Sequence, residues 1–319
     1  MTSHRVSSRR RFLRTAGVLS GSALVFRHAP AGLLEAFQAN PLEQRRAQTG
    51  ATPIVTTKLT DRLALLSGPG GNVVAFHGPD GMIVVDGFVK PAWPKLKAAL
   101  EAIASVPIKS MIDTHWHFDH ADNNGNFHAA GAGVIAHDNT KKRLMEPHDL
   151  LGMHFDPVPT GEVPTQTFAA GLTLNANGEQ VDLRHVPPAH TDTDIFVHFP
   201  KADVLHMGDV FFSATYPFID ASTGGNIDGT IGAVALALKT VTARTKIVPG
   251  HGPLATRASL EAYSRMLTEI RDRVREAKNA GKSLAEVQAA KPSAAFDEAW
   301  GKGMMGANDF VAIVYNTVR

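Results

Sequence analysis

The run THWHFDH at residues 114–120 constrains this chain most, because it places three histidines and one aspartate within six positions. It follows a hydrophobic run, residues 108–112, that predicts a buried strand. Imidazole nitrogen and carboxylate oxygen suit zinc, and in a turn leaving a strand His115 and His117 can point one way while Asp119 and His120 point another. One loop could then serve two adjacent metals. An accidental His-rich surface loop is disfavoured, since so dense a cluster is costly to hold together unless something neutralises it.

The composition bounds the remaining possibilities. With 319 residues, 44% of them apolar, the chain has enough apolar residues for one catalytic domain with shorter additions. The 32 basic and 30 acidic side chains nearly cancel, so we expect no nucleic-acid partner. The sequence has no cysteine, which excludes disulfides, thiol mechanisms and thiolate ligands.

The N-terminus carries a second signal. Residues 8–14 read SRRRFLR, a mildly apolar stretch follows at 15–26, and residues 29–31 read APA, a small-x-small cleavage sequence. This segment resembles a twin-arginine export signal. We therefore expect residues 1–31 to be a signal peptide read by the twin-arginine export machinery, and the mature protein to be periplasmic or secreted without stable membrane insertion. The alternative is a basic amphipathic helix lying on a membrane.

The rest of the chain divides by composition into a polar linker (32–52), a catalytic domain (53–280) and a helical C-terminal tail (281–319). A GPDG turn at residues 78–81 predicts a hairpin, and residues 145–167 predict a long loop or flap near the site. Two mixed sheets with helices on their outer faces fit this order. Strand patterns cover residues 54–59, 63–67, 72–76, 82–86, 108–112, 134–137, 172–176, 180–185, 195–199, 203–207 and 246–248, and helical patterns cover 91–104, 121–130, 229–240 and 260–277.

Three further candidate ligands each follow a predicted strand. His190 lies in PPAHTD after residues 180–185, Asp209 ends the run at 204–207, and His251 lies in the glycine-rich turn PGHG after 246–248. Ligands at the ends of adjacent strands can converge, as active sites in layered α/β folds do.

With these partners, the HxHxDH motif resembles the metallo-β-lactamase superfamily of hydrolases over about residues 59–270. The resemblance implies an αβ/βα sandwich, classed as α/β with four layers, and a site at one edge of the sheets. It also implies that His115, His117 and His190 hold one zinc and Asp119, His120 and His251 the second, with Asp209 bridging both.

The chemistry agrees with that assignment. Two zinc ions about 3.5 to 4 Å apart can share a hydroxide that attacks a carbonyl. Asp119 would orient that hydroxide and deliver a proton to the leaving group, which makes it the candidate catalytic residue. Asp209 stands where thiolate-using lactamases have Cys and another subclass has Ser. It resembles instead the glyoxalase II, lactonase and phosphodiesterase branches.

We therefore expect an exported dinuclear zinc hydrolase acting on a small ester, thioester, lactone or β-lactam, with Fe or Mn as other possible metals. Two alternatives remain open: a mononuclear iron oxidoreductase of the same fold, similar to sulfur dioxygenases, and a non-catalytic periplasmic binding protein with a vestigial site. Substrate specificity is expected to lie in residues 63–72, 145–167 and 213–226, with Tyr216, Phe218 and Asp220 lining the cleft. Asp86 is a candidate for holding a ligating histidine through its second nitrogen.

Overall fold

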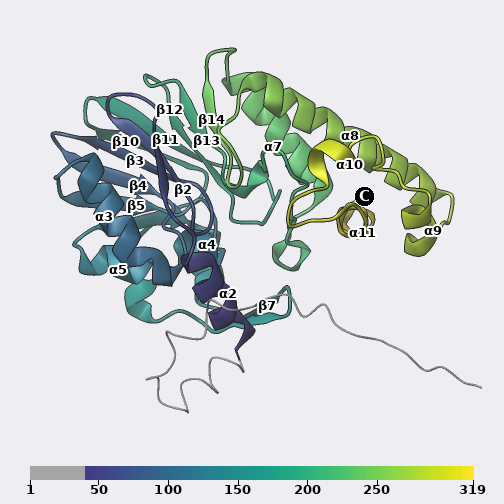
Figure 1. The fold of residues 1–319 in the computed structure, drawn as a ribbon, viewed down its shortest axis with the longest axis horizontal. Coiled ribbons are helices and arrows are strands. Elements are labelled where there is room, and N and C mark those ends of the chain that lie inside the picture. Colours follow the sequence, from purple (N-terminus) through teal and green to yellow (C-terminus); the bar gives the residue numbers. More distant parts are fainter. Residues whose placement is uncertain (1–39) are drawn as a thin grey trace, which may run out of the picture. The chain divides into compact units, whose positions relative to one another are not determined.

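A computed structural model describes residues 40–319, which contain two large mixed sheets (Figure 1). The proposed export signal at residues 1–31 and the first part of the predicted linker lie outside the described residues. The seven-stranded sheet has the spatial order β1 (Val55–Lys58), β2 (Leu63–Ser67), β3 (Val73–Gly78), β4 (Gly81–Val85), β5 (Ile108–Ile112), β6 (Gly133–His137) and β9 (Gln166–Phe168). The five-stranded sheet has the order β10 (Gly171–Ala176), β11 (Glu179–His185), β12 (Ile195–Phe199), β13 (Val204–His206) and β14 (Lys246–Val248).

Each sheet combines an antiparallel meander with parallel strands. Strands β1 to β4 pair antiparallel, with the predicted hairpin closing between Gly78 and Gly81, and β4, β5, β6 and β9 then run parallel. In the second sheet β10 to β13 are antiparallel and β14 joins β13 in parallel. Within the second sheet, β11, β13 and β14 therefore run in the same direction.

Alternation along the strands builds one core between the sheets and one outside each of them. In β3, Val74 and Phe76 face the other sheet, where Phe76 packs edge-on against Phe199 with ring centroids 5.4 Å apart. The intervening Val73 and Ala75 face outward, into a cluster with Leu96 and other residues of the covering helices. This double burial explains why the central strands are apolar on both faces.

Helices cover the outer face of each sheet (Figure 1). Helices α3 (Trp93–Ile103) and α5 (Asn124–Ala129) cover the seven-stranded sheet, while α7 (Ile227–Thr240) and α8 (Arg257–Asn279) cover the five-stranded sheet. The predicted αβ/βα sandwich is confirmed. Shorter helical segments are η1 (Lys90–Ala92), α4 (Phe118–Ala121), α6 (Asp138–Leu144), η2 (Thr160–Glu162), η3 (Gly208–Val210) and η4 (Ala221–Thr223).

Part of the segment predicted as a linker is helical. Helix α2 spans Pro41–Gly50, and its Leu42 is buried in the same cluster as Leu150 and Met153. Arg46 fixes the helix further, because its Nε donates to Asp122 Oδ2 over 2.8 Å. A single buried leucine in a polar helix leaves no amphipathic pattern to read, so tertiary contacts decide this element.

The predicted flap at residues 145–167 contains short strands. Strands β7 (His148–Leu150) and β8 (Met153–Phe155) form a hairpin whose turn residues, Leu151 and Gly152, both have positive φ. Strands of three residues are too short for their alternation to be recognised in the sequence.

The C-terminal tail covers the core of its own chain. It contains α9 (Leu284–Ala289), α10 (Asp297–Trp300) and α11 (Ala307–Thr317). Phe310, Val311 and Val314 of α11 are buried in one cluster with Ile270 and Val274 of α8. Within residues 40–319, no helix combines the length and apolar character needed to cross a membrane.

Candidate metal centre

All seven predicted ligands come from loops at one edge of the sandwich. The loop after β5 carries His115, His117, Asp119 and His120, the last two within α4. Strands β11, β13 and β14 run in the same direction and are followed by His190, Asp209 and His251 respectively. The convergence expected from the sequence therefore has a direct structural cause, which is that like-directed strands end at the same edge.

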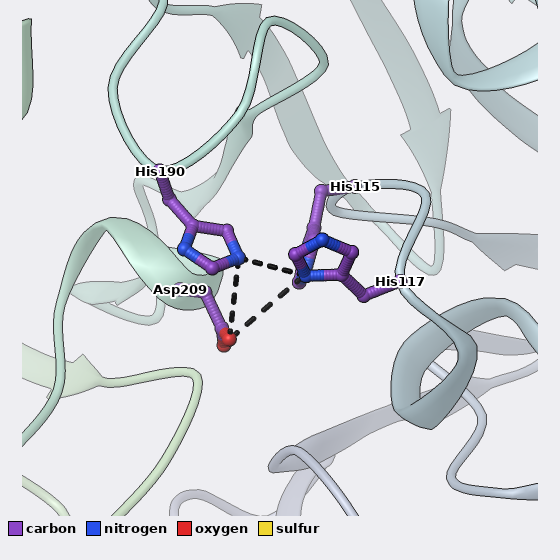
Figure 2. Close-up of side chains that lie close together, drawn as sticks. All are labelled: His115, His117, His190 and Asp209. Carbon is purple, nitrogen blue, oxygen red and sulfur yellow. Dashed lines mark hydrogen bonds and ion pairs between the residues drawn. The ribbon is translucent and has the colours of Figure 1, made fainter. Parts of the chain in front are cut away.

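One group consists of His115, His117, His190 and Asp209, whose ligand atoms all lie within 4.8 Å of one another. Figure 2 shows the rings of His117 and His190 with nitrogens facing each other, the Asp209 carboxylate near both, and His115 behind His117. Nε2 of His190 lies 2.9 Å from Nδ1 of His117. Asp209 Oδ2 lies 3.6 Å from that same His190 nitrogen and 3.9 Å from His115 Nε2.

A second group consists of Asp119, His120 and His251, again with ligand atoms within 4.8 Å of one another. His251 Nε2 lies 3.2 Å from Asp119 Oδ2. Asp209 connects the two groups, because its Oδ1 lies 3.2 Å from His120 Nε2 and its Oδ2 lies 3.4 Å from His251 Nε2. Its carboxylate thus lies where a ligand shared by two cations would be.

Hydrogen bonds on the far side of the rings fix which nitrogen faces the centre. His190 Nδ1 donates to the carbonyl oxygen of Phe218 over 2.8 Å, so the facing Nε2 of the neutral ring has no hydrogen. His117 Nε2 lies 3.2 Å from Asp220 Oδ2 and donates to it, so Nδ1 of the neutral ring is likewise a lone pair. Two lone pairs facing each other at 2.9 Å repel unless a proton or a cation lies between them.

The rings of His120 and His115 are held in the same way. His120 Nδ1 donates to Asp86 Oδ2 over 2.8 Å. The Thr114 hydroxyl also donates to Asp86, over 2.9 Å, and its oxygen is 3.1 Å from His115 Nδ1, from which it can accept. Asp86 therefore holds His120 directly and His115 through Thr114. The prediction that Asp86 supports a ligand ring is consistent with these contacts.

Three buried polar atoms at the centre have no hydrogen-bond partner among residues 40–319. They are His115 Nε2, His120 Nε2 and Asp209 Oδ1, which belong to the two ligand groups, and the last two lie 3.2 Å apart without hydrogen-bond geometry. Buried polar atoms are rarely left without a partner, since desolvation without compensation is costly. The donor set, imidazole nitrogens with carboxylate oxygens and no sulfur, fits divalent zinc, iron or manganese.

The electrostatics of the cluster favour a cation. Burial lowers the pKa of His120, but the carboxylates of Asp209, Asp86 and Asp119 outweigh burial and hold that pKa well above its usual value. Burial likewise opposes protonation of His251, yet Asp209 and Asp119 raise its pKa to about 10. Carboxylates that stabilise a proton on a ring would equally stabilise a metal ion between the rings.

Two rings of the first group, His115 and His190, resist protonation. Burial lowers the pKa of His190 to about 4 in spite of Asp209. Burial and the neighbouring His120 hold the pKa of His115 well below its usual value. Neutral imidazoles are the form in which histidine binds metals.

Two glycines let the backbone approach the ligands. A Cβ at Gly250 would overlap Asp209 Oδ1, and a Cβ at Gly71 would overlap the ring of His120. The amide of Gly250 donates to the carbonyl oxygens of Gly208 and Phe211, at 2.8 and 3.0 Å, which fixes the turn against η3. Any larger residue at Gly250 would therefore displace the carboxylate that lies between the two groups.

A pocket of about 300 Å³ opens over both groups. Its floor is formed by His117, Asp119, Asp209 and His251, and most of its wall residues are apolar. The walls come from the three segments expected to carry specificity, from Phe118 and Phe212 in the ligand-bearing loops, and from two segments that the sequence did not indicate, α2 and the C-terminal tail. These wall residues are Gly68, Gly70, Phe118, Leu150, Leu151, Met153, Phe212, Thr215, Tyr216 and Phe218, together with Arg45, Thr49 and Met304.

Not all residues near the site have the roles that the sequence predicted. Tyr216 and Phe218 line the pocket as predicted, but Asp220 is not among the lining residues, and its carboxylate holds His117 from behind. His137 and His185 stack on each other with ring centroids 3.7 Å apart, away from the two ligand groups. Arg45 and Met304 carry no local signal, because only the tertiary fold brings them to the pocket.

Comparisons with known proteins agree with this architecture. Residues 67–263 match the family description of the metallo-beta-lactamase superfamily. A metallo-beta-lactamase from Pontibacter korlensis superposes with a TM-score of 0.56 at 17% identity, over 67% of this chain and 99% of that chain. The stereoselective inverting sec-alkylsulfatase Pisa1 from Pseudomonas sp. gives a TM-score of 0.64 at 13% identity, over 86% of this chain and 51% of that one. At these identities the likeness concerns the fold.

A curated relative is the 2,4-dinitroanisole O-demethylase subunit alpha of Nocardioides sp. (strain JS1661). It is 26% identical over 151 residues, which is 46% of this chain and 43% of the relative. The match therefore spans less than half of the relative's length.

Proposed function

Because this chain belongs to the metallo-β-lactamase superfamily, we propose that it is a metal-dependent hydrolase with a dinuclear zinc site. The observation that carries the proposal is the pair of neighbouring donor groups joined by Asp209. A non-catalytic protein with a vestigial site would be expected to lack at least one donor, whereas all seven stand together here. Iron with an oxidative reaction remains the alternative, and metal analysis distinguishes it.

In the proposed site, His115, His117 and His190 would hold one ion, Asp119, His120 and His251 would hold the other, and Asp209 would be available to both. Bound zinc lowers the pKa of water and polarises the bond to be cleaved. Asp86 and Asp220 hold His120 and His117 on one ring nitrogen each, which would leave the other nitrogen of each ring free to bind an ion. The protein's contribution is to place these donors before substrate arrives.

Asp119 is the proposed proton-transfer residue. Of the two carboxylates in the ligand set its side chain is the more accessible, 18% exposed against 5% for Asp209, and it lines the pocket floor. Burial raises the pKa of Asp119, but His120 and His251 outweigh burial and lower it to about 2, so the side chain is a carboxylate at neutral pH. It can accept a proton from the attacking water and pass it to a leaving group.

The pocket supports a proposal for the substrate class. Aromatic and aliphatic walls around a polar floor fit a small molecule with an apolar body and one hydrolysable group. Esters, thioesters, lactones and β-lactams are the proposed carbonyl substrates. The relatives add two bonds worth testing, an aryl methyl ether and a secondary alkyl sulfate.

We also propose that residues 1–31 direct export by the twin-arginine route, which supports a periplasmic or secreted site of action. The separate domain limits, with a catalytic domain at 53–280 and a tail at 281–319, are part of the same proposal.

The test is metal analysis of the purified protein combined with a substrate panel. We expect two zinc ions per chain and hydrolysis of at least one of a nitrophenyl ester, a lactone, a thioester, a chromogenic cephalosporin, a nitrophenyl methyl ether and an alkyl sulfate. One iron per chain with oxygen consumption would replace the hydrolase proposal with the oxidoreductase.

A further inference from the structure

Helix α2 carries two adjacent arginines in contrasting surroundings. Arg46 is neutralised by Asp122, with Nε to Oδ2 at 2.8 Å, and by Glu43 at 2.6 Å. Arg45 has no carboxylate within 4.0 Å among residues 40–319, and its guanidinium contacts the sulfur of Met304 at 3.6 Å. Of the two arginines, only Arg45 lines the pocket.

The surroundings of Arg45 at the pocket are apolar and solvent-exposed. Leu151 and Met304 are 58% and 57% exposed, and both line the same pocket as Arg45. Leu151 adopts a φ of 52° at the turn of the β7–β8 hairpin, a conformation that costs free energy for a residue other than glycine. Met304 contacts Arg45 and Leu151 lines the same pocket, so exposed apolar side chains and a cation share one surface, which suits an apolar anion.

The pocket thus has two polar ends joined by apolar walls. The floor carries four of the seven donors, and Arg45 is the only arginine or lysine among the described residues that line the pocket. A guanidinium can donate two parallel hydrogen bonds to a carboxylate, sulfonate or sulfate. A substrate with its reacting group on the floor and an apolar body along the walls would bring a terminal anionic group to Arg45.

We propose that Arg45 is a specificity-determining residue, and that the substrate is an elongated apolar molecule with an anionic group remote from the cleaved bond. The identity of the reacting end rests on the proposed function. Recognition of the anionic end rests only on Arg45 and its apolar neighbours. The two parts can therefore be tested separately.

The direct test uses two fluorescent probes on the full-length, zinc-loaded protein. They are 1-anilinonaphthalene-8-sulfonate and N-phenyl-1-naphthylamine, which share an aromatic body and differ in the sulfonate. We expect Arg45→Gln to weaken binding of the sulfonate about threefold to tenfold, the range for an accessible charge-assisted contact, and to leave the neutral probe within about twofold. Arg45→Glu should weaken the sulfonate further, and Arg45→Lys should retain part of its binding.

Three controls locate the effect. Arg244→Gln removes an exposed arginine that is not part of the pocket and should change neither probe. Phe218→Ala, in the pocket wall, should weaken both probes alike. Unaltered thermal unfolding of Arg45→Gln would show that α2 remains in place. The proposal is overturned if Arg45→Gln leaves sulfonate binding unchanged, or if it weakens both probes equally.

A catalytic comparison separates the two proposals. Nitrophenyl hexanoate and the nitrophenyl monoester of hexanedioic acid differ by a terminal carboxylate, and Arg45→Gln should raise the KM of the acidic ester alone. If zinc-loaded wild-type protein cleaves neither these esters nor the wider substrate panel, the hydrolase proposal fails, while the probe pair still decides the role of Arg45. An equal rise in KM for both esters would overturn the role of Arg45.

Discussion

Nδ1 of His117 and Nε2 of His190 lie 2.9 Å apart, and in the neutral rings neither nitrogen carries a hydrogen, because the opposite nitrogen of each ring donates to Asp220 and to the carbonyl oxygen of Phe218. Such a contact requires a cation or a proton between the rings. The Nε2 atoms of His115 and His120, which are buried without a hydrogen-bond partner among residues 40–319, also support a cation at this site.

Metal removal should therefore destabilise the protein. We expect a chelator to lower the thermal unfolding temperature by several degrees, and zinc to restore it in a concentration-dependent way. A ligand present at 100 times its Kd adds about 2.7 kcal/mol to the free energy of unfolding. Differential scanning fluorimetry with and without the chelator measures this. An unfolding temperature that changes with neither the chelator nor zinc would contradict the proposed metal site.

The carboxylates behind the rings should control metal affinity. Asp220→Asn is expected to weaken binding of the ion next to His117 by about tenfold to a hundredfold, because an amide binds the imidazole N–H less well than a carboxylate. Asp86→Asn should weaken binding of the ion next to His120 by a similar factor, and binding of the first ion less, because Asp86 reaches His115 only through Thr114. Competition with a chromophoric chelator gives both affinities. Asp272→Asn, on the exposed side of α8, is the matched control and should leave them unchanged.

Asp119→Asn should separate proton transfer from folding. It keeps the size of the side chain while removing the charge, so kcat is expected to fall by about 10²- to 10⁴-fold with the fold intact. The rate on the best substrate of the panel and the zinc content of the variant are measured together. An Asp119→Ala variant that hydrolysed every substrate at the wild-type rate would show that the proposed mechanism is wrong.

Gly250→Ala should damage the site through a single methyl group. Its Cβ would meet Asp209 Oδ1 in a turn whose amide is already hydrogen-bonded, so we expect zinc affinity to fall by at least tenfold. Gly232→Ala is the matched control, since nothing lies within 4 Å of its Cβ and it is in helix α7. That control should bind zinc normally and be about 0.5 to 1 kcal/mol more stable.

Acid should destabilise the protein partly through His185. Burial, and then the stacked ring of His137, hold its pKa below the ordinary value of 6.5. A depressed histidine pKa favours the neutral ring in the folded state, so this contribution to stability is complete above pH 6.5 and is lost as the pH falls below it. At saturating zinc, the unfolding free energy of His185→Gln should therefore fall less steeply between pH 6.5 and 5 than that of the wild type. Parallel curves would refute the assignment.

The sequence alone was sufficient to predict features that depend on neighbouring residues, such as strands, turns and the ligands that follow strand ends. The apolar runs at residues 82–86 and 108–112 predict strands that appear as β4 and β5, and the GPDG turn predicts the hairpin between β3 and β4. The residues that follow β5, β11, β13 and β14 include all seven candidate ligands, because a strand end and its turn are local features. The predicted sandwich fold is confirmed by the two mixed sheets and by the similarity to solved structures.

Only the tertiary structure showed which residues hold the ligand rings and which residues line the pocket. Asp220 lies 103 positions from His117, and no sequence periodicity links a carboxylate to a ring at that separation. Arg45 and Met304 meet across 259 positions, so a segment that predicts a linker becomes part of the pocket wall. The physical reason is that residue type and spacing determine which atoms can bind a cation, whereas the packing of distant segments determines which ring nitrogen faces it and what else reaches the pocket.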